Sequence, residues 1–256
     1  MLQVRKVVKS FGGLVALNRL DLEIEDSEIL GVIGPNGAGK TTLFNVVSGY
    51  FPPTEGEVRF DGEDITGLRA DEIAALGISR TFQAATLFTA LSVLENVFVG
   101  CHMQYKTHIW KRLLRTPAAL REEGRLKARA MEILEFMGLS SLKDELAGNL
   151  PHGHQKILSA SMAIATGPKL LLLDEPVTGM NETEIAAMVD LVRRIRDSGI
   201  TIAVVEHNMK TVVNLCDRLV VLNYGQKIAE GPPREILEKE EVIEAYLGEK
   251  EADDVA

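Results

Sequence analysis

The residues with the clearest chemical capacity lie in a glycine-rich segment, 34–41, which matches the pattern G-x-x-x-x-G-K-[ST]. Glycines allow the backbone to wrap a phosphate with successive N–H groups pointing inward. The Lys40 ammonium would reach the outer phosphates of a nucleotide, and the Thr41 hydroxyl would ligate Mg²⁺. The segment follows an expected strand, 30–33, and opens an expected helix, 41–48, whose N-terminal dipole favours an anion. We expect nucleotide binding by Asn36, Gly37, Ala38, Gly39, Lys40, Thr41 and Thr42.

A pair of adjacent acids, Asp174 and Glu175, follows a run of four leucines. An acid at the carboxyl end of a parallel strand lies beside the ligand crevice of an α/β sheet. We expect Asp174 to hold Mg²⁺ and Glu175 to polarise an attacking water. Taken alone, the pair could instead cap the next helix, but the phosphate loop upstream favours the catalytic interpretation.

The rest of the chain supplies elements that can position these residues. Alternation and β-branched content predict strands at 2–8, 20–24 and 57–60. The last is followed by the turn signal Asp61-Gly62, and the close spacing indicates a small antiparallel sheet. Apolar or β-branched runs at 170–173, 201–205 and 219–222 indicate a parallel sheet covered on both faces.

Helix formers dominate from residue 93 to about 165, with one helix expected over 120–137 and ended by Gly138. We expect one domain, 1–256, in three parts: a core (1–92 and 166–231), a helical subdomain (93–165), and a C-terminal helix with an acidic tail (232–256). The stretch 104–121 is basic and contains Trp110. It is interpreted as a solvated basic helix, or as a contact with a membrane partner or lipid headgroups.

Composition limits the partners. The net charge of −9 and the pI of about 5.2 argue against nucleic acid as the main partner, since phosphate neutralisation needs clustered Lys and Arg. Cys101 and Cys216 are far apart in sequence, as expected for a reduced cytosolic chain. No signal core and no run of about 18 apolar residues is present, so we expect any membrane role to come through a partner.

Taken together, these residues resemble the ABC ATPases over nearly the whole chain, from Val4 to about Leu247. The resemblance implies an α/β, RecA-like P-loop NTPase core with an antiparallel β-subdomain and an inserted helical subdomain. It also implies that Phe11 stacks on adenine, although a core Phe is the other interpretation. Gln83 would touch the metal and the attacking water, and His207 would contact the γ-phosphate.

The same resemblance implies that the loop Gly179, Met180 and Asn181 reaches the opposite site of a two-subunit assembly. Several phrases look like the ATPases of branched-chain amino-acid importers, including RTFQ at 80–83, EHNMK at 206–210 and the basic insertion at 104–121. ATPases of urea or amide importers, lipid exporters and soluble non-transport ABC ATPases stay open as alternatives. A GTPase would show an Asn-Lys-x-Asp motif, which is absent, and a nucleotide kinase would not need Gln83 or His207.

One segment departs from the family. Its Leu-Ser-Gly-Gly-Gln signature is replaced by Pro151, His152, Gly153 and His154 after Leu150. Pro151 has neither a hydroxyl nor an N–H to offer the partner's ATP, although Pro at the first helical position suits a helix. A homodimer would thus have two weakened sites, and we favour a heterodimer with an intact-signature subunit. A metal site or pH sensor at His152 and His154 is a weaker interpretation, because residues two apart do not share a helical face.

The resemblance therefore implies an ATPase that uses ATP and Mg²⁺, with Glu175, His207 and Gln83 as catalytic residues and Thr41, Gln83 and Asp174 around the metal. The expected partners are a second ABC ATPase subunit, integral membrane permease subunits and, indirectly, a solute-binding protein. The expected location is peripheral, on the cytoplasmic face of the inner membrane.

Overall fold

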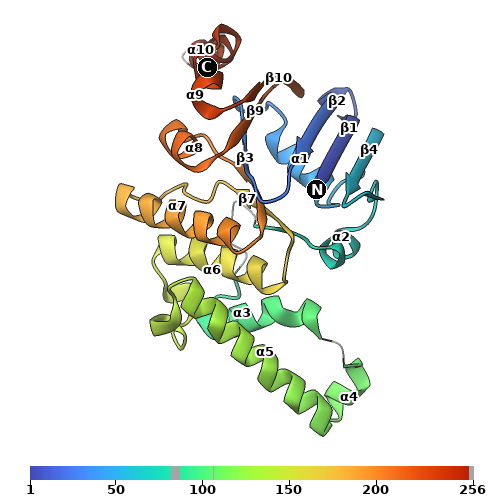
Figure 1. The fold of residues 1–256 in the computed structure, drawn as a ribbon, viewed down its shortest axis with the longest axis vertical. Coiled ribbons are helices and arrows are strands. Elements are labelled where there is room, and N and C mark those ends of the chain that lie inside the picture. Colours follow the sequence, from blue (N-terminus) through green and yellow to red (C-terminus); the bar gives the residue numbers. More distant parts are fainter. Residues whose placement is uncertain (82–86, 106, 254–256) are drawn as a thin grey trace.

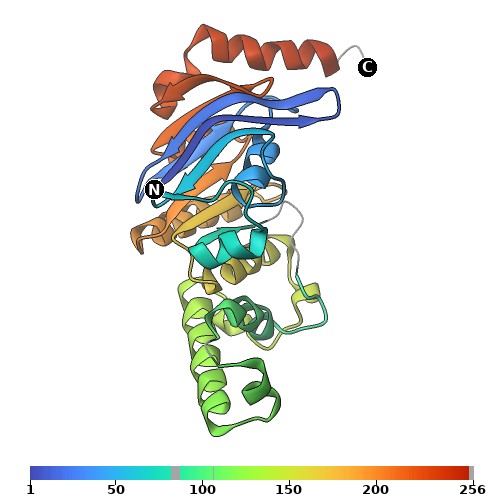
Figure 2. The same ribbon diagram turned by 90° about the vertical axis from the view of Figure 1, so that its right-hand side faces the viewer.

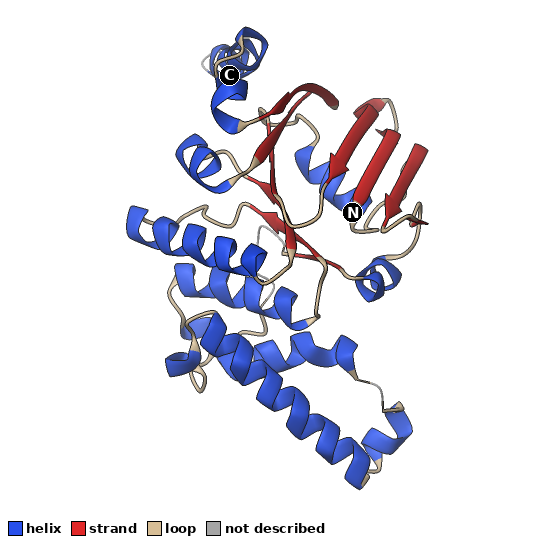
Figure 3. Ribbon diagram, in the orientation of Figure 1, coloured by secondary structure: helices blue, strands red, loops and turns tan. Residues whose placement is uncertain are grey.

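The computed structural model describes residues 1–81, 87–105 and 107–253, with side chains as far as residue 246. Figures 1 and 3 show a sheet-containing part that carries both termini and a helical part that extends away from it. The strands are β1 (Leu2–Phe11), β2 (Leu14–Ile24), β3 (Ile29–Ile33), β4 (Glu55–Phe60), β5 (Glu63–Asp64), β6 (Ile78–Arg80), β7 (Leu170–Asp174), β8 (Thr201–Val205), β9 (Arg218–Asn223) and β10 (Gln226–Gly231). The α-helices are α1 (Lys40–Val47), α2 (Ala70–Leu76), α3 (Val93–Gly100), α4 (Ile109–Leu113), α5 (Pro117–Phe136), α6 (His152–Ala165), α7 (Glu182–Asp197), α8 (Met209–Leu215), α9 (Pro233–Leu237) and α10 (Glu240–Asp253).

The main sheet has the strand order β10-β9-β3-β8-β7-β6 within the described residues. Its pairs from β9 to β6 are parallel, and β10 adds an antiparallel edge. Alternate residues of β7 enter two different cores: Leu171 and Leu173 face the cluster with the helices α3, α5, α6 and α7, whereas Leu170 and Leu172 face the cluster with α1 and the second sheet. The expected parallel sheet, buried on both faces, is therefore confirmed.

The second sheet is antiparallel, with the order β2-β1-β4-β5. It confirms the expected small sheet, but its first two strands are longer than predicted and carry register shifts after Val4 and Val7. Asp61 and Gly62 both have positive φ, 49° and 83°, as the tight turn between β4 and β5 requires.

The helical part packs on the main sheet through α6 (Figure 2). Buried apolar residues of α5 lie at helical spacing and face α3 and α6: Leu126, Ala130, Ile133 and Leu134. Helix α5 starts earlier than expected because Thr116 accepts a hydrogen bond from the Ala119 N–H and Pro117 fits the first turn. Helix α6 starts at His152, so Pro151 is its N-cap and not, as predicted, its first residue. Among the described residues, no helix is long and apolar enough to span a bilayer.

Packing of α5 predicts a contrast between two leucines on one helix. Leu126 is fully buried and Leu120 is 44% exposed. Leu126→Ala should lower the free energy of unfolding by about 2–5 kcal/mol, and Leu120→Ala by less than about 1 kcal/mol, because only the first leaves a cavity. Urea unfolding followed by circular dichroism measures both. Equal losses would contradict the packing described for α5.

Candidate functional site

Three parallel strands end at the same level, and the candidate site lies beyond their carboxyl ends. Val32 of β3 pairs with Val205 of β8, and Val205 pairs in turn with Asp174 of β7. The residues that follow these strands must therefore meet at one edge of the sheet: Gly34, Glu175, Glu206 and His207. This is the edge at which open α/β sheets bind ligands.

The phosphate loop depends on two glycines with no room for a side chain. A Cβ on Gly34 would lie 2.1 Å from the Leu222 carbonyl oxygen, and one on Gly39 would lie 2.6 Å from the Ala16 carbonyl oxygen. Both have positive φ, 148° and 105°. The Lys40 Nζ donates to the Gly34 and Pro35 carbonyls at 2.6 and 2.8 Å, so its ammonium lies against the loop that precedes it.

A cavity of about 450 Å³ opens in front of this loop. It brings together the predicted residues Phe11, the loop from Asn36 to Thr42, Glu175 and His207. Phe11 is 42% exposed at this cavity, which excludes the core interpretation. The volume lies in the range of small-molecule sites, and an aromatic wall opposite a loop with a buried ammonium fits a nucleoside triphosphate.

Four other residues line the cavity but were not predicted from the sequence: Leu14, Val15, Ala16 and Tyr224. Tyr224 and Gly225, both at positive φ, form the turn between β9 and β10. The Gly225 N–H donates to the Ala38 carbonyl at 3.0 Å, which holds this turn against the phosphate loop. The only sequence signal is a Tyr-Gly turn, which does not tell where the turn docks.

Asp174 is buried and compensated by a cation that sequence analysis assigned no role. Its Oδ2 accepts a hydrogen bond from Arg80 at 2.8 Å, and both side chains are at most 5% exposed. Arg80 also donates to Asn45 Oδ1 of α1 at 2.6 Å. The exposed Thr41 hydroxyl and the Asp174 carboxylate are oxygen ligands that suit Mg²⁺, and a bound cation would compete with Arg80 for the carboxylate.

Glu175 is held in a strained conformation. Its φ is +49°, a left-handed value that is unfavourable for a residue with a side chain. The Glu175 N–H donates to the Val205 carbonyl at 2.9 Å, and the Thr178 hydroxyl donates to Glu175 Oε2 at 3.2 Å. His207 Nε2 lies 3.2 Å from Glu175 Oε1, and this imidazole is 46% exposed on the cavity side.

Lys156 and Glu206 are two further buried charged residues near Glu175. The Lys156 Nζ donates to the Glu175 carbonyl oxygen at 3.3 Å. Burial lowers the pKa of Lys156, and the carboxylates of Glu175, Glu206 and Asp174 oppose that shift. Burial raises the pKa of Glu206, although its oxygens accept from the Val177 and His207 N–H groups. A raised pKa means that the native chain binds this proton more tightly than the unfolded chain does. The Glu206 carboxyl therefore lowers the free energy of unfolding as the pH rises above the ordinary pKa of a glutamate.

The signature positions lie away from the cavity of the same chain, at the start of α6. Gly153 is packed so closely that a Cβ would lie 2.8 Å from Glu184 Oε1, and one on Gly179 would lie 3.0 Å from His152 Cε1. His152 is therefore next to the loop of Gly179, Met180 and Asn181, whose Asn181 side chain accepts from the Glu184 N–H and caps α7. Gln83 lies outside the described residues. No cluster of metal-binding side chains involving His152 or His154 occurs in the described part of the chain.

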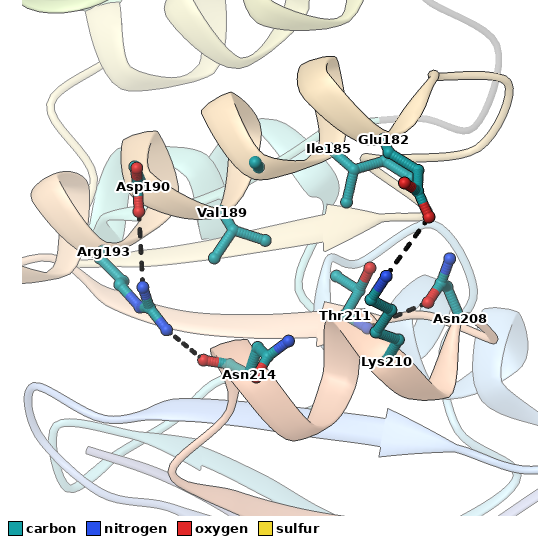
Figure 4. Close-up of a pocket in the computed structure, with 10 residues that line it drawn as sticks. Glu182, Ile185, Val189, Asp190, Arg193, Asn208, Lys210, Thr211 and Asn214 are labelled. Carbon is teal, nitrogen blue, oxygen red and sulfur yellow. Dashed lines mark hydrogen bonds and ion pairs between the residues drawn. The ribbon is translucent and has the colours of Figure 1, made fainter.

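A second hollow, of about 460 Å³, lies between α7 and α8 (Figure 4). Its charged groups already pair with one another: Lys210 Nζ lies 3.3 Å from Glu182 Oε1, and Arg193 lies 3.4 Å from Asp190 Oδ1. The two helices begin just after Asn181 and His207, respectively. We therefore interpret the hollow as the space between α7 and α8, the helices that follow Asn181 and His207, and assign it no ligand.

A phosphate loop between β3 and α1, with acids at the end of a neighbouring parallel strand, defines a P-loop nucleoside triphosphatase. Residues 17–178 match the family model "ABC transporter", and residues 226–252 match the model "Branched-chain amino acid ATP-binding cassette transporter". The chain is 39% identical to the high-affinity branched-chain amino acid transport ATP-binding protein BraF of Pseudomonas aeruginosa and 40% identical to LivG of Escherichia coli. Each alignment covers 97% of this chain and 98% of the relative.

Solved structures agree with these matches. The ADP conformation of MJ1267, an ATP-binding cassette of an ABC transporter, has a TM-score of 0.85 and 34% identity, over 97% of this chain and 98% of that one. The chain therefore belongs to the ATP-binding subunits of the ABC transporter family. It is an ATPase, as the resemblance implied, and the GTPase and nucleotide-kinase interpretations are excluded.

The contact between Lys156 and Glu175 predicts a defect in turnover. Lys156→Met should lower kcat by about 10–100-fold, because one charge-assisted hydrogen bond to the strained Glu175 backbone is lost. The KM for ATP should change little, since Lys156 is not among the residues that line the cavity. Steady-state ATPase assays on the assembled transporter measure both constants.

Two variants separate positioning from general destabilisation. Lys156→Arg should recover part of the kcat, and Lys127→Met, at an exposed position of α5, should leave it unchanged. An unaltered kcat in Lys156→Met, with a folded fraction equal to wild type, would refute the positioning role.

Proposed function

We propose that this chain energises the import of branched-chain amino acids by binding and hydrolysing ATP on the cytoplasmic face of a membrane. The observation that carries the ATP-dependent part is the single cavity that joins Phe11, Lys40, Glu175 and His207. The cargo assignment is supported by the branched-chain match at 226–252 and by relatives named for that transport. Importers of urea or amides, lipid exporters and soluble non-transport ATPases are the competing assignments.

Each residue has a role that its position supports. Phe11 stacks on the adenine, and the loop from Asn36 to Thr42 binds the phosphates through its N–H groups. Thr41 and Asp174, with Gln83, hold Mg²⁺, which supplies charge neutralisation at the phosphates when bound. The Lys40 ammonium neutralises the outer phosphate oxygens.

Glu175 and His207 act at the γ-phosphate. The Glu175 carboxylate, fixed by its backbone and by Thr178, orients the attacking water and draws on its proton. His207, half exposed toward the cavity, donates to the γ-phosphate oxygens as they gain charge. The 3.2 Å contact between the two side chains lets His207 keep Glu175 in place until the nucleotide arrives.

An apolar groove is the proposed docking site for a membrane permease. It has a volume of about 400 Å³ and lies between α2 and β6 on one side and α3 and α6 on the other. Arg80, Thr81 and Phe88, which flank the segment of Gln83 in sequence, line it. A helix of the permease in this groove would sense the cavity through Arg80, which is bonded to Asp174.

The altered signature supports a heterodimer in the transporter. Relatives of known structure include MJ0796, whose title describes a dimeric post-hydrolysis state with ADP and Pi, at 25% identity and a TM-score of 0.77. The resemblance to the ABC ATPases implies that each subunit of such a pair offers its signature to the other's ATP. Pro151 offers neither an N–H nor a hydroxyl there, whereas this chain's own cavity retains Lys40, Glu175 and His207.

The function predicts leucine uptake that depends on Glu175. In proteoliposomes with the permease and the leucine-loaded solute-binding protein, Glu175→Gln should lower ATP-driven uptake by about 100-fold or more while ATP affinity is kept. The exposed surface change Glu182→Gln is the matched control and should leave uptake unchanged. Stimulation by a urea-loaded binding protein alone, or purification without any polytopic membrane protein, would favour the competing assignments.

The proposed asymmetry predicts which subunit's acid matters. Complexes are assembled with Glu175→Gln in this chain, or with the corresponding change in the partner ATPase. Turnover should collapse in the first and persist in the second, because only this chain's site is completed by an intact signature. Collapse in the second with survival in the first would overturn the heterodimer assignment.

A further inference from the structure

We propose that the short helix α4 and the turn after it form a membrane anchor, which inserts apolar side chains among the headgroups of an anionic lipid bilayer. The apolar face consists of Ile109, Trp110, Leu113 and Leu114, which are 66–76% exposed. Their spacing of one, four and five residues places them on one side of the helix. The anchor rests on the proposed function only in that a transporter subunit works at a bilayer.

Helix α4 contacts its own chain through Arg112 and leaves its apolar face uncovered. The Arg112 guanidinium carbon lies 3.6 Å from the centre of the Tyr105 ring, a cation–π contact that holds α4 against its own chain. None of the five residues of α4 is buried. Four large apolar side chains exposed together on one short helix are unusual for a soluble surface, which indicates an apolar environment in the working assembly.

Charge favours an anionic lipid surface as the occupant. Lys111 and Arg115 flank the apolar face, and the sequence contains no Asp or Glu from Asn96 to Arg121. This local excess of positive charge stands in a chain whose net charge is −9. Basic residues with Trp and Leu in one short helix are typical of elements that lie in the headgroup region.

The position of α4 on the molecule also agrees with a contact with the lipid bilayer. On the right-hand side of Figure 1, α2, the end of α3 and α4 follow one another, and Figure 2 views the same side directly. Residues of α2 and the end of α3 line the proposed permease groove: Ala70, Ala74, Val99 and Gly100. A permease seated there would bring the membrane to the side of the molecule on which α4 projects.

Trp110 is the only tryptophan of the chain, so its fluorescence reports on α4 alone. The full-length chain is mixed with vesicles of equimolar phosphatidylglycerol and phosphatidylcholine, or of phosphatidylcholine alone, without any permease. We expect a blue shift and protection from acrylamide only with the anionic vesicles, together with co-flotation of the protein.

The variants test the two contributions separately. Leu113→Ser and Leu114→Ser should each weaken vesicle binding by about tenfold, through lost apolar insertion. Lys111→Gln with Arg115→Gln should weaken it by about 25-fold, since each basic residue contributes about fivefold near an anionic surface. Arg112 is left intact because it stacks on Tyr105. Ile243→Ser on α10 and Arg129→Gln on α5 are the matched controls and should bind as wild type.

ATP hydrolysis by the complex should be unchanged in these variants, so a failed anchor is distinguishable from a failed transporter function. An unshifted, acrylamide-accessible Trp110 with both vesicle types would overturn the proposal. So would a blue shift that appears only when the permease is present, because α4 would then be a protein-docking surface.

Discussion

The common level of β3, β7 and β8 is the constraint on which the rest of the site depends. Pairing of Val32 with Val205, and of Val205 with Asp174, fixes where these strands stop. The chain must then turn within a residue or two, which requires positive φ at Gly34 and at Glu175. Gly34 accepts this geometry readily, whereas Glu175 adopts it at a cost of about 1–3 kcal/mol. Its hydrogen bonds to Val205, Thr178 and Lys156 offset that cost and fix the carboxylate at the cavity.

Converging strand ends also concentrate negative charge, and two buried cations besides Lys40 lie close to these acids. Arg80 from β6 pairs with Asp174, and Lys156 from α6 contacts Glu175 and lies near Glu206. Removal of Arg80 would leave the buried Asp174 carboxylate without this ion pair, which is costly in a low-dielectric interior. Because Arg80 lines the proposed permease groove and Lys156 lies one turn beyond Gly153, the two cations connect the catalytic edge to two surfaces that we propose to be interfaces.

Local sequence patterns were sufficient to predict much of the fold and part of the candidate site. The phosphate loop, the parallel core, the antiparallel sheet and the turn at Asp61 were predictable because each depends on residues close together in sequence. Arg80, Lys156 and Tyr224 were not, since their partners lie far along the chain: 94 positions separate Arg80 from Asp174. The predicted start of α6 at Pro151 is one residue early: proline is favoured at the first helical position, but Pro151 has an extended ψ of 151° and is the N-cap. The domain limits and the roles of the individual site residues stay predictions.

The start of α6 carries both the altered signature positions and Lys156, which supports the chain's own cavity. The signature positions cap α6 and pack on Gly179 and Glu184, so their structural role survives the loss of the serine and glycine donors. Lys156 lies in the same helix and reaches the chain's own Glu175. With the roles that we propose, helix α6 supports Glu175 in its own cavity while offering little to a partner's nucleotide. Both sets of residues lie in the first two turns of α6, but their side chains face different groups: Gly153 packs on Glu184, and Lys156 reaches Glu175. This separation is the physical basis on which, as we propose, one subunit of a pair can lose its signature and remain catalytic.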